Sequence, residues 1–143
     1  MKKFLTFLFL CISVQVFSQK SEPKQDSMKI RACALDYIEG WYAGDTIRMD
    51  RALHPDMVKM QVSSLDGAYV LTPVSKSSMM EYTRAGYGKA VPKDKLKNEI
   101  TILDQFGGIA SVKIVSYNYV DYLQLAKWNG EWKILEVLWQ SIR

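Results

Sequence analysis

Apolar residues recur with helical spacing near the start of the predicted domain. At 100° per residue they form one stripe, and polar positions such as Lys29 and Glu39 lie opposite it. The members of the stripe are Ile30, Ala34, Tyr37, Ile38 and Trp41. Asp26 or Ser27 can cap this helix, which we expect to run to about residue 43 and to end at Gly44. Its apolar stripe must face a sheet or another helix.

Two shorter helices are also expected. Asp45 can cap the first of them, and His54-Pro55 ends it because a proline ring disfavours helical geometry in the residue before it. Ser75 can cap the second, which covers roughly residues 76–85. Each short helix therefore follows a residue whose side chain can accept hydrogen bonds from a first helical turn.

Residues 57–64 alternate with a period of two, which predicts a strand. Its two faces consist of Val58, Met60 and Val62 on one side and of Lys59, Gln61 and Ser63 on the other. The pair Asp66-Gly67 predicts a hairpin turn, and a return strand is expected over residues 69–72.

The last third of the chain is expected to form strands. Their ranges are 96–102, 109–117, 119–128 and 131–142, and the pair Asn129-Gly130 is a strong two-residue hairpin signal. The expected order is two helices, two strands, one helix and four strands. Helices gathered on one side of a curved antiparallel sheet make an α+β cone. Because the last strands are apolar on both faces in part, we expect a homodimer formed through the sheet.

The N-terminus has the three parts of a signal peptide. Met1-Lys2-Lys3 is basic, residues 4–17 are almost continuously apolar, and Val16 and Ser18 fit a cleavage site before Gln19. The alternative, an N-terminal membrane anchor, needs a longer apolar run. We therefore expect an exported protein, periplasmic or secreted, with a signal peptide at 1–18, a flexible leader at 19–25 and one folded domain at 26–143.

Composition narrows the classes of function. Two of the 19 Lys and Arg residues lie in the signal peptide, so the mature chain is close to neutral against 15 acidic residues. No basic cluster predicts a nucleic-acid partner. Cleavage leaves Cys33 as the one cysteine, so no internal disulfide is expected. One histidine and one cysteine are too few for a usual metal site, and no phosphate-binding or dinucleotide motif predicts a cofactor.

Three segments carry a resemblance to a known family. They are Ala-Leu-Asp-Tyr-Ile-Glu-Gly-Trp-Tyr-Ala-Gly-Asp at 34–45, Ala-Leu-His-Pro-Asp at 52–56, and residues 110–139 with Val-Asp-Tyr-Leu at 120–123 and Trp-Lys-Ile-Leu at 132–135. Their order and spacing resemble the putative lumazine-binding family of the nuclear transport factor 2-like superfamily, which includes SnoaL-like and ketosteroid isomerase-like proteins. The resemblance covers essentially the whole mature domain. It implies the cone fold and a pocket.

The resemblance also implies a polar pair. Tyr37 and Asp121 stand at positions similar to the two oxyanion-stabilising donors of ketosteroid isomerase. Asp121 shares a strand face with Tyr119, and burial there would raise its pKa and favour the neutral carboxyl, which donates a hydrogen bond. The alternative is a core tyrosine and an outward-facing aspartate. The isomerase also needs a carboxylate base on its first strand, whereas this chain has Gln61, so the isomerase activity is not transferred.

His54 is the one histidine of the chain. Dehydratase relatives use a histidine and an aspartate as acid and base, so His54 with Asp121 or Asp56 is a candidate couple. The alternative is a structural histidine at a helix end, where the helix dipole favours its cation.

Flat aromatic side chains could wall the pocket. The ligand-binding candidates are Tyr37, Trp41, His54, Tyr82, Tyr119, Asp121 and Trp139. The leading hypothesis is an exported binding protein for a small planar organic molecule. The alternatives are an isomerase- or dehydratase-type enzyme using Tyr37, Asp121 and His54, and an accessory module whose convex sheet matters more than its pocket.

Overall fold

The computed structural model describes residues 23–142 of the 143-residue chain. The predicted signal peptide lies outside the described residues, as does most of the predicted leader. The first helix begins at Pro23, inside the segment expected to be the leader and a few residues before the expected caps. Among the described residues, no helix is both long and apolar enough to cross a membrane.

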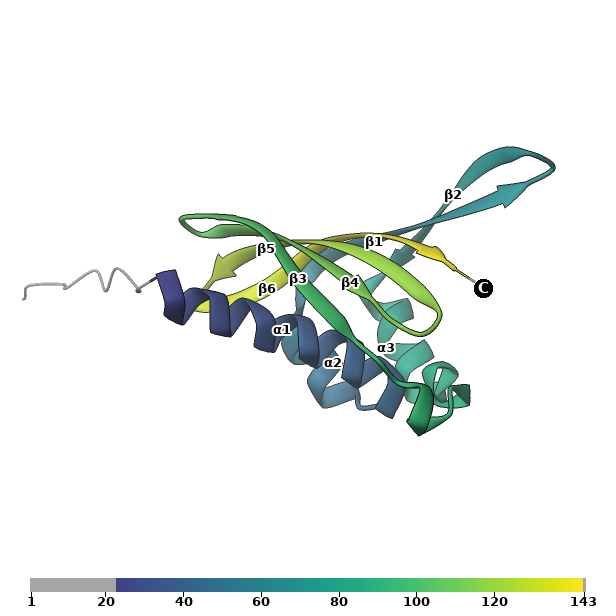
Figure 1. Ribbon diagram of the computed structural model, residues 1–143, viewed down its shortest axis with the longest axis horizontal. Helices are drawn as coiled ribbons and strands as arrows, with labels where there is room; N and C mark the ends of the chain where they lie inside the picture. Colours follow the sequence, from purple (N-terminus) through teal and green to yellow (C-terminus); the bar gives the residue numbers. More distant parts are fainter. Residues whose placement is uncertain (1–22, 143) are drawn as a thin grey trace, which may run out of the picture.

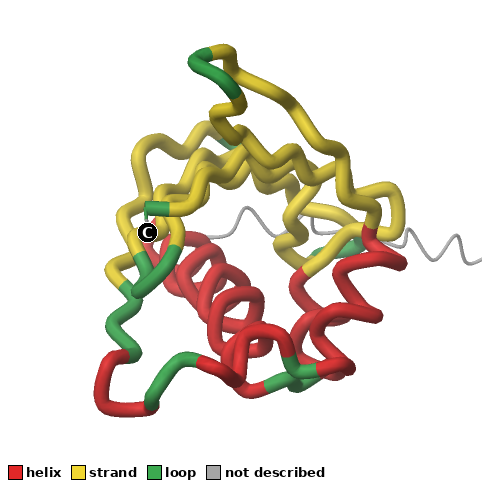
Figure 2. Tube along the Cα trace, turned by 90° about the vertical axis from the view of Figure 1, so that its right-hand side faces the viewer, coloured by secondary structure: helices red, strands yellow, loops and turns green. Residues whose placement is uncertain are grey.

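Three helices lie against one face of a curved six-stranded sheet (Figures 1 and 2). The helices are α1 (Pro23–Ala43), α2 (Thr46–Ala52) and α3 (Lys76–Ala85), followed by the short 3-10 turns η1 (Tyr87–Ala90) and η2 (Lys93–Lys95). The strands are β1 (Leu53–Leu65), β2 (Ala68–Ser75), β3 (Glu99–Phe106), β4 (Ile109–Val115), β5 (Tyr119–Trp128) and β6 (Glu131–Ser141). The predicted α+β cone and the predicted order of elements are confirmed.

The strand order across the sheet is β2-β1-β6-β5-β4-β3. Neighbouring strands are antiparallel except for β1 and β6, which run parallel. This parallel pairing places the β1–β2 hairpin beside the last strand of the chain. The sheet is therefore mixed, where the sequence predicted an antiparallel one. In Figure 1 the β1–β2 hairpin extends beyond the body of the sheet.

Local sequence signals account for the ends of the helices. The Asp45 carboxylate accepts hydrogen bonds from the backbone N–H groups of Ile47 and Arg48, which caps α2. The Ser75 hydroxyl accepts one from the backbone N–H of Ser78 and caps α3. Four residues of the predicted apolar stripe of α1 are buried against the sheet: Ile30, Ala34, Tyr37 and Ile38.

A β-bulge explains why β6 is apolar on both faces. Gln124 pairs with Glu136 while Leu125 pairs with Ile134, so Leu135 is one extra residue without a partner on β5. The side chains of β6 that point inward are therefore at even-numbered positions before the bulge and at odd-numbered positions after it. Trp132 and Ile134 are buried before the bulge and Val137 is buried after it.

The polar face of β1 is the one that faces the interior. Val58 is 53% exposed, whereas Lys59 is 7% exposed and its neighbour on the same face, Met57, is 3% exposed. A lysine is rarely buried unless a counter-charge lies beside it. Residues of other elements must therefore supply that charge.

Candidate functional site

A cavity of about 340 Å³ lies between the helices and the concave face of the sheet. Its walls come from α1, α3, η1 and the strands β1, β2, β5 and β6. The aromatic residues lining it are Tyr37, Trp41, Tyr82, Tyr87, Tyr119 and Trp139; the other polar residues are Lys59, Gln61, Thr72 and Asp121. This volume is within the range of small-molecule sites in proteins.

Three polar side chains from three elements meet in the cavity. The Tyr37 hydroxyl on α1 donates a hydrogen bond to Asp121 Oδ1 on β5, with 2.9 Å between the oxygens. The Lys59 ammonium on β1 donates to the Tyr37 hydroxyl and also lies 3.3 Å from Asp121 Oδ1. All three side chains are buried. Asp121 is therefore the counter-charge that the buried lysine requires.

Burial changes the protonation chemistry of this triad. Removal from water lowers the pKa of Lys59, and the nearby Asp121 carboxylate partly opposes that decrease. Burial raises the pKa of Tyr37 well above its usual value, and the Asp121 charge raises it further. Tyr37 is consequently a neutral hydroxyl. Asp121 Oδ1 accepts hydrogen bonds from two groups, whereas the resemblance implied that Asp121 would donate one.

Three buried polar atoms of cavity-lining residues have no hydrogen-bond partner among the described residues. They are Asp121 Oδ2, Trp41 Nε1 and Trp139 Nε1. A buried donor or acceptor without a partner costs about 1–3 kcal/mol. One acceptor and two donors on residues that line one cavity thus lack partners within the described protein.

Aromatic rings form two walls of the cavity. Tyr82 and Tyr87 are stacked, with ring centroids 5.4 Å apart and an angle of 12° between their planes. Tyr119 meets Trp139 edge to face at 5.1 Å, and the Lys59 ammonium lies 4.6 Å from the Trp139 ring centroid. Flat apolar surface beside a buried cation suits a planar molecule that carries a polar group.

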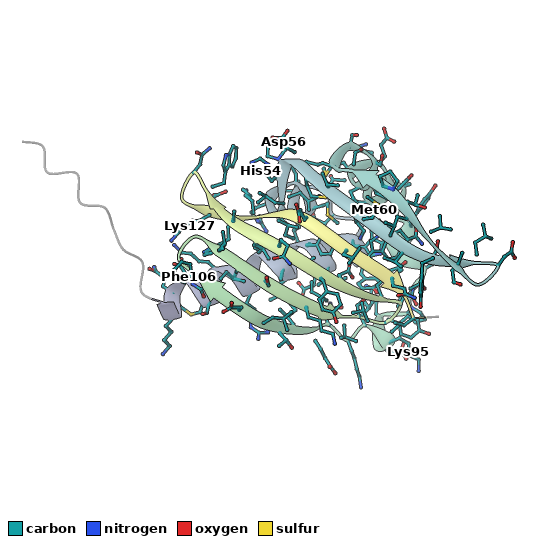
Figure 3. The ribbon with its side chains drawn as sticks, turned by 90° about the horizontal axis from the view of Figure 1, so that it is seen from above. His54, Asp56, Met60, Lys95, Phe106 and Lys127 are labelled. Atoms are coloured by element: carbon teal, nitrogen blue, oxygen red, sulfur yellow. The ribbon has the colours of Figure 1, made fainter. Side chains whose placement is uncertain are left out.

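His54 is the one predicted site residue that does not line the cavity. It lies at the start of β1 and not at the end of a helix, and Figure 3 labels it beside Asp56, with Met60 farther along the same strand. Its ring packs edge to face on Trp128, 4.8 Å between centroids, and its Nδ1 accepts a hydrogen bond from the backbone N–H of Asp56. The structure therefore separates His54 from Tyr37 and Asp121.

Sequence reasoning missed the most informative residue of the site, Lys59. A signal for it exists in the sequence. In one of the two alternatives Asp121 lay on a buried strand face with no cation assigned to it, and an uncompensated buried carboxylate is very unfavourable. Lys59 lies on the strand that supplies the base in the related isomerase, so pairing the two charges would have placed it in the pocket.

Side chains of the types that commonly bind metal ions do not form a cluster in the described part of the chain. Among residues 23–142, no set of three or more His, Cys, Asp or Glu side chains is arranged to hold a metal ion. Cys33 is buried, its thiol donates to the Ala52 carbonyl oxygen, and burial raises its pKa to about 12. A thiol in this state is unreactive.

Comparison with known proteins agrees with this fold. Residues 25–140 match the model of a family described as "Putative lumazine-binding". No curated protein sequence matches the chain. The matches to solved structures described next are below 25% identity, so they concern the fold.

Three solved structures illustrate the shared fold. A nuclear transport factor 2-like protein of unknown function from Shewanella baltica is 17% identical, with a TM-score of 0.66, over 86% of this chain and 98% of that one. A second such protein, from Methylobacillus flagellatus, is 16% identical with a TM-score of 0.65, over 87% and 98% of the two chains. A ketosteroid isomerase-like protein from Erwinia carotovora is 15% identical with a TM-score of 0.57, over 81% and 95%.

Proposed function

The chain belongs to the putative lumazine-binding family, with a nuclear transport factor 2-like fold, and from this premise we propose that it binds a small planar organic molecule in the cavity around Tyr37, Lys59 and Asp121. The observation that carries the proposal is the set of three unpartnered polar atoms in the cavity walls. A ligand that offers a donor to Asp121 Oδ2 and acceptors to the indole N–H groups would satisfy all three.

The chemistry of the walls favours a heterocycle. Lumazine, the molecule in the family's name, and the related pterins are flat and carry N–H and C=O groups along one edge. Such an edge presents donors and acceptors side by side, while the ring faces can pack on Tyr82 and Trp139. A steroid offers fewer polar groups and an aromatic polyketide lacks the ring N–H donors, so each serves as a comparison compound.

Binding is tested by thermal shift and calorimetry with lumazine, a pterin, a steroid and an aromatic polyketide. We expect at least one compound to raise the melting temperature, because a ligand that binds the folded state stabilises it. Replacing Tyr82 with alanine should weaken the binding of that compound by about 1 kcal/mol, or roughly fivefold, since one stacked wall is lost.

Tyr69→Ala is the matched control. Tyr69 is an exposed tyrosine on β2 that does not line the cavity, so its loss should leave the affinity unchanged. If Tyr69→Ala weakened binding as much as Tyr82→Ala did, or if no compound of the four classes bound, the proposed cavity function would be rejected.

One observation favours an enzymatic role as the second candidate. A basic group now lies within hydrogen-bonding distance of Tyr37 and Asp121, and that group is Lys59, not His54. An isomerase or dehydratase of this geometry would use Lys59 to move the proton while Tyr37 polarises an oxygen. Gln61 cannot act as a base, but Lys59, two residues earlier on the same face of β1, can.

We also propose that the mature protein is exported and forms a homodimer through the outer face of the sheet. The signal-peptide pattern of the sequence supports export. Apolar side chains on the outer face support the dimer: Val58 on β1, Tyr122 on β5 and Leu138 on β6 are all about half exposed. Exposed apolar patches of this kind mark association sites.

Leu138→Glu tests the dimer by size-exclusion chromatography with light scattering. We expect the wild type to elute as a dimer and the variant as a monomer, because a buried carboxylate would face an apolar partner surface. Ile47→Glu is the control, since Ile47 is an exposed aliphatic residue on α2, on the helical side of the molecule. A monomeric wild type would contradict the proposal.

A further inference from the structure

The amino group of Lys59 occupies an unusual place for a lysine nitrogen. Its side chain is 8% exposed, and Nζ lies beside both the Tyr37 hydroxyl and the Asp121 carboxylate, in a cavity large enough for a two-ring molecule. The aromatic ring of Trp139 lies on another side, 4.6 Å away. The nitrogen is therefore adjacent both to space for a ligand and to two groups that can exchange protons with it.

Burial makes this nitrogen a better nucleophile than an ordinary surface lysine. Desolvation lowers the pKa of Lys59, so a larger fraction is present as the neutral amine near pH 7. Surface lysines, with pKa values near 10.4, are almost fully protonated at that pH. Desolvated lysines of this kind form Schiff bases with carbonyl compounds.

We propose that Lys59 forms an imine with an aldehyde or ketone carried on a flat organic molecule in the cavity. This inference rests on the proposed ligand-binding function of the cavity and adds the chemical class of the ligand and a covalent step. The carbonyl carbon would lie against Nζ, its oxygen would take the place next to the Tyr37 hydroxyl, and the ring system would pack between the aromatic walls.

The step balances within the triad. The Lys59 ammonium first gives one proton to the Asp121 carboxylate. The neutral amine then attacks the carbonyl carbon: a C–N bond forms, and the π electrons of the C=O bond move to oxygen. The Tyr37 hydroxyl donates a proton to that oxygen and regains one from the nitrogen, which gives the carbinolamine.

Loss of water completes the imine. The Asp121 carboxyl group returns its proton to the carbinolamine hydroxyl, the C–O bond breaks, and water leaves as the nitrogen lone pair forms the C=N bond. The products are a protonated imine on Lys59, the Asp121 carboxylate beside it, and one water molecule. The reaction uses no oxidant or reductant, and the buried ion pair has the same charges before and after it.

Reductive trapping tests the proposal on the full chain. The protein is incubated with 2-naphthaldehyde and sodium cyanoborohydride at pH 7, and the products are analysed by intact mass and peptide mapping. Among the lysines, we expect the adduct to form at Lys59 about tenfold or more faster than at any other, since the cavity holds the carbonyl group beside Nζ and makes the step effectively intramolecular.

Two variants locate the reaction. Lys59→Arg keeps the buried cation and removes the nucleophile, so the fast adduct should disappear. Lys133→Arg is the matched control, because Lys133 is a second buried lysine that donates to the Arg51 carbonyl oxygen and does not line the cavity; it should retain the adduct. Circular dichroism checks that both variants fold, and Lys59→Met replaces Lys59→Arg if the larger guanidinium prevents folding.

A comparison compound separates this inference from the proposed function. 2-Naphthalenemethanol has the same rings and no carbonyl, so it reports non-covalent binding. If the alcohol raised the melting temperature but 2-naphthaldehyde labelled lysines without preference for Lys59, the imine would be rejected and the binding function would stand. If neither compound interacted with the cavity, the imine would be rejected, and the binding function would be decided by the four compound classes named for it.

Discussion

Replacing Asp121 with asparagine is expected to lower the free energy of unfolding by about 3–5 kcal/mol, because it leaves the buried Lys59 cation without its counter-charge. The Asp121 carboxylate is 3.3 Å from Lys59 Nζ and accepts the Tyr37 hydrogen bond, and its side chain is 2% exposed. The asparagine side chain has nearly the same shape, so the loss reports charge more than packing. Urea denaturation at pH 7, followed by circular dichroism, measures it.

Asp50→Asn is the matched control. Asp50 pairs with Lys76 at 2.8 Å, a shorter distance than the Lys59 pair, but the Asp50 side chain is 63% exposed. Solvent screens such pairs, and their loss costs about 0–1 kcal/mol. We therefore expect a large effect at Asp121 and a small one at Asp50, although the second ion pair is closer. Equal effects would mean that Asp121 is not held by a buried charge.

The double variant Lys59→Met with Asp121→Leu separates stability from function. Replacing both members of a buried ion pair with apolar residues is often neutral or even stabilising. We expect the double variant to recover most of the stability that Asp121→Asn loses and to bind no ligand through this site. A double variant that was no more stable than Asp121→Asn would contradict the account of the pair.

Sequence patterns predict the fold class but not the ion pair between Lys59 and Asp121. The helix stripe from Ile30 to Trp41, the Asp45 and Ser75 caps and the Asn129-Gly130 hairpin all depend on neighbours along the chain, and these features define the fold class. The site depends on distant neighbours. Lys59 and Asp121 are 62 residues apart, and their meeting requires the parallel pairing of β1 with β6, which no local pattern indicates.

Which face of a strand points into the interior is a second feature that local sequence patterns do not determine. On β1 the usual preference for apolar residues inside would bury Val58, but the structure buries Lys59 because Asp121 offers it a partner. On β6 the bulge at Leu135 changes the inward phase partway along the strand. The first departure occurs in the cavity wall, where the chain has polar groups to place.

Gly88 has a packing role that no sequence pattern indicated. It lies in η1, where this turn packs against α1, and a Cβ atom added to it would be 2.4 Å from the backbone oxygen of Trp41 and 2.9 Å from Trp41 Cδ1. Real Cβ atoms do not approach backbone this closely. The missing side chain therefore sets the distance between η1 and the helix that supplies Trp41 to the cavity.

Gly88→Ala is accordingly expected to lower the free energy of unfolding by about 2–3 kcal/mol through overpacking and to weaken ligand binding. The backbone of α1 or η1 must move apart, and both elements line the cavity through Trp41 and Tyr87.

Gly108→Ala is the matched control, because its added Cβ would meet only the Lys127 Cβ at an ordinary 3.7 Å. That substitution should leave both quantities nearly unchanged, since its small effect comes mainly from a less flexible unfolded chain. Denaturation and calorimetry on the two variants measure the difference. Equal stability of the two would show that η1 adjusts without moving Trp41, and the proposed link between this turn and the cavity would then fail.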